Sequence, residues 1–564
     1  MEKPWLRAYP PGVPAELPIG KEQSLTEWFA DCCRRYGDLP AFASLGQHLT
    51  YAELQEQANA LASVLVHQLH LAPGSRVALL LPNLLQYPVC LFGIWLAGCV
   101  AVPCNPEYTP RELETQLGDA EVDAIIVVEL FARTLQQTLP RLRRADGSPL
   151  QPQVIVTRVG DLLGAVRGRL IDWHLRYWRR QIPGWHLPQA LMLADLLEDG
   201  ATLPPAGRRT SAGDLALLQY TGGTTGVPKG AMLTHRNLLA NLAQAKAWCS
   251  SVLEERKEVV ITALLLYHIF ALTANCLLFV ELGGCNELVA NARDIGGLVG
   301  LMARTRFTAM TGVNTLFLSL LEHPDLPSID FSRLKIALGG GMAVQAAVAE
   351  GWQRATGRLL IEAYGLTETS PAVTINPLGL TGFNGSIGLP LPSTDLTIRD
   401  DAGNDLPAGR LGEICVHGPQ VMQGYWRQPA ETADAFWHDD FLRTGDIGMM
   451  DEHGFFRLLD RKKDVIVVSG FNVYPNEVEA VASSHPGVHE VAAVAQRSVH
   501  SGEIVKLVVV RNDPSLTAEA LKAFCRAELA PYKVPQQIEF CDHLPRNPVG
   551  KILRRRLREE PPRR

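Results

Sequence analysis

Residues 219–233 read QYTGGTTGVPKGAML, with four glycines and three threonines around a single lysine. The apolar run DLALLQY at 214–220 leads into this stretch, so the pattern predicts a strand that ends in a glycine-rich loop. The backbone N–H groups that glycines expose, together with the hydroxyls and the lysine charge, suit a polyphosphate. Flexible surface loops also collect glycine and threonine, so composition alone leaves that alternative open.

The stretch does not follow the P-loop rule G-x-x-x-x-G-K-[ST]. Two residues separate Gly226 from Lys229, and a glycine rather than a hydroxyl residue follows the lysine. In a P-loop the hydroxyl of the residue after the lysine holds magnesium, and this chain has no hydroxyl at that position. The sequence therefore disfavours a P-loop kinase or ATPase and indicates a different phosphate chemistry.

Short apolar runs alternate with helical patterns along most of the chain. Examples are RVALLLP at 76–82, DAIIVVE at 123–129, QVIVTRV at 153–159 and LKIALGG at 334–340. Uniformly apolar strands between helices predict parallel sheets that are covered on both faces. The expected fold class is therefore α/β.

The character of the sequence changes after residue 459. A charged segment, DRKKD at 460–464, precedes a compact pattern of strands and helices and a basic tail. A chain of 564 residues also exceeds what one hydrophobic core usually organises. We expect a large N-terminal domain of mainly parallel sheets over residues 1–459, and a small mobile α+β domain over 460–564 with a hinge near 460–464.

Composition excludes several classes of protein. The formal net charge of -6 gives no general reason to bind nucleic acid. Eleven cysteines are scattered without a CxxC or a Cys/His cluster at zinc spacing, which indicates free thiols in a reducing compartment. The N-terminus lacks the apolar core of a secretory signal. We therefore expect a cytoplasmic protein that binds no nucleic acid.

Two long segments contain no Asp, Glu, Lys or Arg, namely 77–106 and 259–280. Either is long enough to cross a membrane. However, prolines interrupt the first segment, and the second contains polar residues such as Thr273 and Asn275. Both segments are better interpreted as buried α/β core.

Residues 162–182, LLGAVRGRLIDWHLRYWRRQI, set five arginines against one aspartate. Leu170, Trp173 and Tyr177 recur at helical spacing, so one face could be apolar and the other basic. Such a helix can lie peripherally on the anionic inner face of a membrane. A surface helix packed on the main domain is the other interpretation, and the sequence leaves both open.

Five motifs, in order, resemble those of the adenylate-forming (AMP-binding) superfamily of acyl-CoA synthetases, luciferases and peptide-synthetase adenylation domains. TGGTTGVPKGAMLTHRN at 221–237 resembles its phosphate loop, and YGLTETSP at 364–371 its nucleotide and magnesium motif. The remaining three are RTGDIG at 443–448 (ribose), DRKKDVIVVSGFNVYPNEVE at 460–479 (hinge) and PRNPVGKILRR at 545–555 (catalytic lysine). The flanking sequences resemble bacterial long-chain fatty-acid CoA ligases.

The resemblance implies a two-step reaction, because a carboxylate is a poor acyl donor. AMP is first attached to the acid with release of pyrophosphate, and a thiol then displaces AMP. The implied enzyme is a long-chain fatty acid:CoA ligase that uses ATP, Mg²⁺ and CoA. The alternatives are a ligase for medium-chain, branched or terpenoid acids and a non-catalytic lipid- or nucleotide-binding relative, and formation of a homodimer stays open.

The resemblance also implies roles for individual residues in the nucleotide site. The phosphate loop would comprise Thr221, Gly222, Gly223, Thr224, Thr225, Gly226 and Lys229. Adenine would lie between the turn Gly339, Gly340, Gly341 and Tyr364. Thr367 would contact the α-phosphate, Glu368 and Thr225 would hold Mg²⁺, Asp446 and Arg461 would bind ribose, and Lys551 would reach the α-phosphate and the carboxylate.

Further residues are implied for the acyl group and for CoA. The acyl group would lie against Tyr267, His268, Phe270, Ala271, Val313 and Asn314. No carboxylate is near His268 in the sequence, so we expect a wall or gate at this position rather than a general base. Ser469, Gly470 and Phe471 would border the pantetheine channel after the small domain rotates about Lys463.

Overall fold

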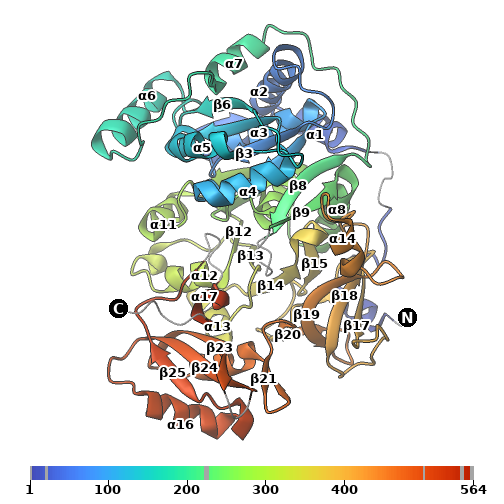
Figure 1. Cartoon of the computed structure of the whole chain (residues 1–564), viewed down its shortest axis with the longest axis vertical. Coiled ribbons are helices and arrows are strands. Elements are labelled where there is room, and N and C mark those ends of the chain that lie inside the picture. The colour runs from blue at the N-terminus through green and yellow to red at the C-terminus, as the bar shows by residue number, and fades with distance from the viewer. Residues whose placement is uncertain (1–2, 19–22, 222–227, 499–501, 547–551, 559–564) are drawn as a thin grey trace.

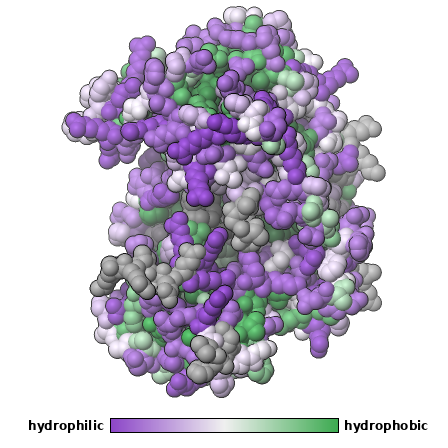
Figure 2. Space-filling view, in the orientation of Figure 1, coloured by the Kyte–Doolittle hydropathy of each residue, from purple (hydrophilic) through white to green (hydrophobic). Residues whose placement is uncertain are grey.

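The computed structural model describes residues 3–18, 23–221, 228–498, 502–546 and 552–558. Two large sheets with their helices form the upper body in Figure 1, a four-stranded sheet lies at its side, and a smaller sheet lies below. Hydrophilic side chains dominate the same face in the space-filling view of Figure 2.

The first large sheet has seven strands, of which all but the last neighbouring pair are parallel. In spatial order they are β7 (Leu191–Met192), β6 (Gln153–Thr157), β5 (Ala124–Val128), β3 (Arg76–Leu80), β4 (Val100–Pro103), β8 (Leu215–Thr221) and β9 (Lys229–Thr234). The glycine-rich stretch of the sequence connects β8 to the antiparallel β9. The predicted strand before this stretch is confirmed as β8.

The second large sheet has nine strands, with six parallel strands in its middle. In spatial order they are β16 (Leu389–Pro390), β15 (Ala372–Ile375), β14 (Leu360–Gly365), β13 (Ile336–Gly339), β12 (Ala309–Gly312), β10 (Val259–Thr262), β11 (Cys285–Leu288), β1 (Pro40–Ser44) and β2 (Gln47–Thr50). The chain order reverses between β10 and β12. Ligands of open α/β sheets bind outside the carboxyl ends of strands at such a reversal.

Helices cover the two large sheets and begin where local sequence signals favour them. Ser24, Thr50, Thr109 and Thr234 each cap the first turn of a helix with a reciprocal side-chain bond. The helices of this part are α1 (Leu25–Tyr36), α2 (Tyr51–Ser63), α3 (Gln86–Leu96), α4 (Pro110–Ala120), α5 (Ala132–Thr138), α6 (Ala165–Trp173), α7 (Leu193–Gly200), α8 (His235–Cys249), α9 (Ile269–Ala271), α10 (Leu278–Glu281), α11 (Ile295–Arg304), α12 (Asn314–Leu321), α13 (Ala346–Thr356) and α14 (Pro429–Ala435).

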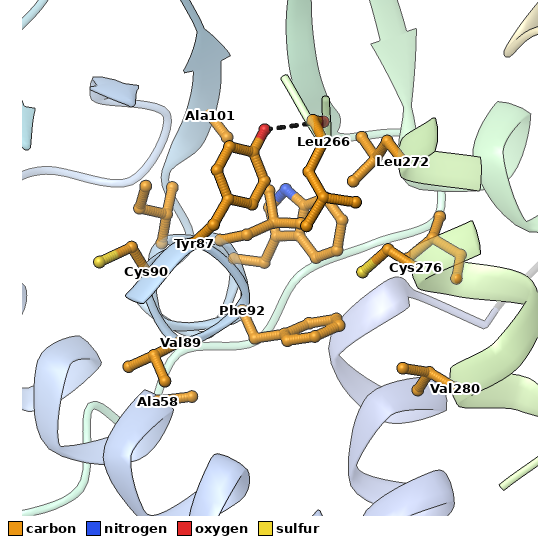
Figure 3. Close-up of a cluster of buried hydrophobic side chains, with 14 of the residues drawn as sticks. Ala58, Tyr87, Val89, Cys90, Phe92, Ala101, Leu266, Leu272, Cys276 and Val280 are labelled. Atoms are coloured by element: carbon orange, nitrogen blue, oxygen red, sulfur yellow. Dashed lines mark hydrogen bonds between the residues drawn. The ribbon is translucent and has the colours of Figure 1, made fainter. Parts of the chain in front are cut away.

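The two uncharged segments meet in the core between the two large sheets, as Figure 3 shows. Tyr87 on α3 donates its hydroxyl to the carbonyl of Leu266 at 3.0 Å, and Phe92 lies near Cys276 in the same cluster. The interpretation of both segments as buried core is confirmed. No helix in the described part of the chain is long and apolar enough to span a bilayer.

A four-stranded antiparallel sheet lies beside the parallel sheets. It consists of β17 (Asp395–Arg399), β18 (Gly412–His417), β19 (Leu442–Met450) and β20 (Phe456–Arg461). Its last hairpin sets Asp446 directly opposite Arg461. The sheet therefore positions two residues that are 15 positions apart in the chain, which general strand patterns alone did not predict.

Residues after 465 form a separate five-stranded sheet with helices on it. The strands are β21 (Ile466–Val468), β22 (Phe471–Val473), β23 (Val488–Ser498), β24 (Gly502–Arg511) and β25 (Gln537–Phe540), and the helices are α15 (Pro475–Ser483), α16 (Ala518–Glu528) and α17 (Arg554–Arg558). Its own buried cluster includes Val478, Leu507 and Leu521. These elements agree with the expected α+β class.

Candidate functional site

A cavity of about 1720 Å³ lies at the carboxyl ends of the central strands of both large sheets. Its walls include residues that follow β10, β12, β13 and β14. They also include residues of the hairpin of β8 and β9, which carries the predicted phosphate loop and is called the phosphate hairpin below. Arg546, Ile552 and Arg554 line it from the side of the C-terminal sheet. One cavity thus brings together most of the predicted motifs from distant parts of the sequence.

Asp446 and Arg461, the residues predicted for ribose, form one connected group with Tyr364, the residue predicted for adenine, and Tyr364 and Asp446 are buried. The Tyr364 hydroxyl donates to Asp446 Oδ2 at 2.7 Å, and Arg461 Nε lies 3.3 Å from Asp446 Oδ1. Burial, and then the charge of Asp446, raises the pKa of Tyr364 well above its ordinary value, so the hydroxyl stays a donor. The Asp446 carboxylate is only 2% exposed and is held in one orientation.

The glycine turn after β13 provides a wall without side chains. Gly340 and Gly341 line the cavity, whereas Gly339 ends the strand behind them. A Cβ at Gly340 would lie 3.1 Å from the Phe270 ring and 3.2 Å from the Ala363 carbonyl oxygen. The space beside this turn is therefore narrow, and a side chain at Gly340 would fill it. A narrow space of this kind suits the flat adenine base predicted here.

Thr367 and Glu368 line the cavity on a short helical turn, η8 (Thr367–Thr369), directly after β14. Glu368 Oε1 accepts a hydrogen bond from the Tyr425 hydroxyl at 2.8 Å. The described part of the chain holds no cluster of three metal-binding side chains. A single carboxylate near a phosphate site fits Mg²⁺, which is usually held by one or two carboxylates, substrate phosphates and waters.

The described ends of the phosphate hairpin both face the cavity. Thr221 ends β8 and Lys229 begins β9, and both line the cavity. The Lys229 ammonium forms an ion pair with Glu431 and lies 5.1 Å from the centre of the Tyr425 ring. Gly222, Gly223, Thr224, Thr225 and Gly226, and likewise Lys551, lie outside the described residues.

Four of the residues predicted for the acyl group line the cavity: Tyr267, His268, Phe270 and Asn314. Ala271 and Val313 are buried beside it but do not form its wall. His268 Nδ1 accepts the backbone N–H of Phe270 at 3.3 Å and so caps α9. This contact gives that ring nitrogen a structural role and agrees with the expectation of a wall.

Sequence reasoning missed an apolar branch of the cavity. Ala245 and Cys249 on α8, with Leu253 after it, follow one another at four-residue spacing and line the cavity together with Leu278 and Phe279. This spacing is a signal in the sequence, but it also fits any helix packed in a core. Only the packing of α8 shows that this face borders a cavity.

The residues predicted for pantetheine do not line the cavity. Ser469, Gly470 and Phe471 lie at the β21–β22 turn, where Phe471 is 56% exposed and stacks on Tyr532 at 4.9 Å between ring centres. Lys463, the predicted pivot, does line the cavity. Burial, and then the neighbouring charge of Arg461, lowers the pKa of Lys463 to about 8.

Comparison with known proteins agrees with this arrangement. The family model "AMP-binding enzyme" matches residues 29–426, and "AMP-binding enzyme C-terminal domain" matches residues 477–551. The chain belongs to the AMP-binding enzyme family, whose members form adenylates.

Several relatives match over nearly their whole length. A protein of Salmonella typhimurium named long-chain-fatty-acid–CoA ligase is 53% identical over 560 residues, which cover 99% of this chain and 98% of the relative. A Bacillus subtilis protein of the same name is 38% identical over 567 residues, with 99% and 98% covered. The crystal structure of ATP-bound MatB from Rhodopseudomonas palustris has a TM-score of 0.78 at 29% identity, and the match covers 95% of this chain and 98% of that one.

Proposed function

We propose that this chain is an AMP-forming long-chain fatty acid:CoA ligase. It converts ATP, a fatty acid and CoA into acyl-CoA, AMP and pyrophosphate through an acyl-adenylate. The names of the full-length relatives support this function. The observation that carries it is the single cavity in which the Asp446–Arg461 pair, Glu368, the phosphate hairpin and an apolar branch meet.

In the first step, a carboxylate oxygen of the fatty acid forms a bond to the α-phosphorus of ATP, and the bond to pyrophosphate breaks. Asp446 accepts hydrogen bonds from the ribose hydroxyls. The Lys229 ammonium stabilises the negative charge on the leaving pyrophosphate. Mg²⁺ held by Glu368 and Thr225 would neutralise phosphate oxygens. Lys551 brings a second positive charge to the α-phosphate, where charge accumulates as the bond forms.

In the second step, the CoA sulfur forms a bond to the acyl carbon, and AMP leaves. The turn Ser469–Phe471 does not line the cavity, so we propose that the small domain rotates to bring this turn to the adenylate. The boundary of the domain would lie at residue 460, with the hinge over 460–464 and the pivot at Lys463. Residues 460 and 461 end β20, and residues 462–465 connect it to β21, which supports a hinge here because a short connector can absorb a rotation.

The apolar branch supports a long acyl chain as the substrate. Its walls include Ala245, Cys249 and Phe279, without a charged side chain among the three. From Ala245 to Cys249, the part of this wall that lies on α8, the chain advances about 6 Å at helical rise. A medium-chain, branched or terpenoid acid is the alternative substrate class.

The substrate class is tested by the release of AMP and pyrophosphate with straight and branched acids from C4 to C18. We expect the ratio kcat/KM to rise with chain length toward the longest acids. A maximum at medium-chain or branched acids would assign the alternative class. No adenylate with any acid, in a folded protein that binds ATP, would support a non-catalytic relative.

We also propose peripheral membrane contact through α6 and the π-helical turn η5 (His174–Trp178) that continues it. The helix lies at the outer edge of the upper body in Figure 1. Its exposed face carries Val166, Leu170, Trp173, Tyr177 and Trp178, each 55% to 74% exposed. Exposed aromatic and aliphatic side chains on one helix, followed by Arg179 and Arg180, suit the interface of an anionic bilayer.

The inward face of the same helix packs closely on the protein through both polar and apolar side chains, with Ile171 and Leu175 against the core. A Cβ at Gly168 would lie 2.2 Å from the Gly160 carbonyl oxygen, and Asp172 accepts the Gly160 N–H at 2.8 Å. Arg176 forms an ion pair with the buried carboxylate of Glu129. Val166, Leu170, Trp173, Tyr177 and Trp178 are therefore exposed in addition to Ile171 and Leu175, the apolar side chains that pack the helix on the core.

A vesicle sedimentation assay tests this contact. Replacing both Trp173 and Trp178 by Ser should lower binding to anionic vesicles, while activity on soluble short acids stays unchanged. Leu411→Ser, at another exposed apolar residue on the four-stranded sheet, is the matched control. Equal binding of both variants and the wild type would refute the contact.

A further inference from the structure

Residues 422–428, MQGYWRQ, form a strap along the edge strand β9 of the phosphate hairpin. Gln423 N–H donates to the Met232 carbonyl at 3.0 Å, Met232 N–H donates to the Gly424 carbonyl at 2.9 Å, and Trp426 N–H donates to the Gly230 carbonyl at 2.8 Å. The strap therefore extends the seven-stranded sheet by a short antiparallel segment, opposite the residues that follow Lys229.

The strap is anchored on its outer side as well. Trp426 Nε1 donates to the Asp119 carbonyl at 3.2 Å, and Arg427 forms an ion pair with Glu121 at 2.6 Å. Successive side chains of an extended segment point to opposite faces. Anchoring Trp426 outward accordingly directs Tyr425 inward, and Tyr425 lines the cavity.

Tyr425 contacts two groups of the nucleotide site at once. Its hydroxyl donates to Glu368 Oε1 at 2.8 Å, and its ring lies 5.1 Å from the Lys229 ammonium. A donor to one oxygen of a carboxylate restricts the directions in which the other oxygen can point.

We propose that Tyr425 is a positioning residue for adenylation: its hydroxyl orients Glu368 toward the metal, and its ring supports Lys229 at the phosphates. The inference rests on the proposed roles of Glu368 and Lys229 and adds a residue to them. Groups that hydrogen-bond a metal-binding side chain typically change metal affinity about 10- to 100-fold when they are removed.

The experiment is ATP–pyrophosphate exchange with a fatty acid, measured across a Mg²⁺ titration. Tyr425→Phe keeps the ring and removes only the hydroxyl, so the Mg²⁺ concentration for half-maximal exchange should rise about 10-fold. Thioester formation from supplied acyl-adenylate should stay unchanged. Tyr425→Leu also removes the ring, and it should raise the KM for ATP at saturating Mg²⁺ as well.

Tyr9→Phe is the matched control, because the Tyr9 hydroxyl donates to the Pro390 carbonyl at 2.6 Å and Tyr9 does not line the cavity. This variant should change thermal stability at most and leave the Mg²⁺ titration as in the wild type. Equal Mg²⁺ dependence of Tyr425→Phe and Tyr9→Phe would overturn the proposal.

Glu368→Gln separates failure of this proposal from failure of the proposed function. If Glu368→Gln shifts the Mg²⁺ titration and Tyr425→Phe does not, only the positioning role is overturned. If neither variant shifts it while the wild type exchanges pyrophosphate, the metal role of Glu368 falls together with the positioning role.

Discussion

The nucleotide side of the cavity and the β21–β22 turn of the C-terminal sheet are built in opposite ways. Tyr364, Asp446 and Arg461 are joined by a hydrogen bond and an ion pair in the cavity wall, where Tyr364 and Asp446 are buried. The turn at Ser469–Phe471 lies outside the cavity, with the Phe471 ring exposed. This difference supports the proposal that adenylation uses a preorganised site and that the thiol step needs parts that move into place.

Lys551→Ala is expected to have the largest effect on the rates of the two half-reactions, and it tests whether they use different parts of the protein. Adenylate formation should fall by roughly 10²–10³, the usual loss when one preorganised charged donor is removed. Thioester formation from supplied acyl-adenylate should fall much less, because the lysine acts only in the first step. Rapid-quench measurement of the two half-reactions checks this, and equal losses in both would argue against rotation of the small domain.

The converse variant is Phe471→Ala, in the turn that does not line the cavity. Thioester formation should fall roughly tenfold because the pantetheine arm loses a positioning contact. Adenylate formation should keep its wild-type rate. Leu411→Ala, at a comparably exposed residue of the four-stranded sheet, serves as the control and should change neither step. A loss of adenylation in Phe471→Ala would contradict the proposal that this turn acts only in the thiol step.

A prediction about stability rather than rate concerns Glu362 on β14. Burial raises the pKa of Glu362 from its model-peptide value of 4.5 to about 8, while Glu362 Oε1 accepts the Val344 N–H at 3.0 Å. The folded state therefore keeps a proton that the unfolded state loses, and stability falls as the pH rises from the unfolded to the folded pKa.

Glu362→Gln keeps the acceptor and cannot ionise. Its stability relative to the wild type should improve by up to roughly 1.4 kcal/mol per pH unit between about pH 5 and pH 8, and then level off. Thermal unfolding of both proteins from pH 5 to pH 9 measures this difference. A constant difference across that range would show that the carboxyl does not change protonation between the two states.

Much of the fold was predictable because apolar runs and motifs are local. DLALLQY predicts β8, and the uncharged segments predict the core in which Tyr87 meets Leu266. The Asp446–Arg461 pair followed from two recognisable motifs, although only the β19–β20 hairpin shows that they face each other.

The rest depends on packing that the sequence does not display. Tyr425 and Glu368 are 57 positions apart, and their contact requires the strap to lie along β9. The cavity face of α8 carries the same spacing as an ordinary core helix. The helix at 165–178 sets Gly168 against Gly160 and packs Ile171 and Leu175 on the core, while Trp173, Tyr177 and Trp178 stay exposed.

The proposed function requires that one cavity holds both parts of a long-chain acyl-adenylate. The ribose would lie on Asp446 and the acyl chain beside α8. A crystal structure with a non-hydrolysable palmitoyl-adenylate analogue tests it most directly. We predict the ribose hydroxyls on Asp446, the phosphate mimic beside Thr367, and the acyl chain between Ala245 and Phe279. An acyl chain outside this branch, or a ribose away from Asp446, would contradict the account.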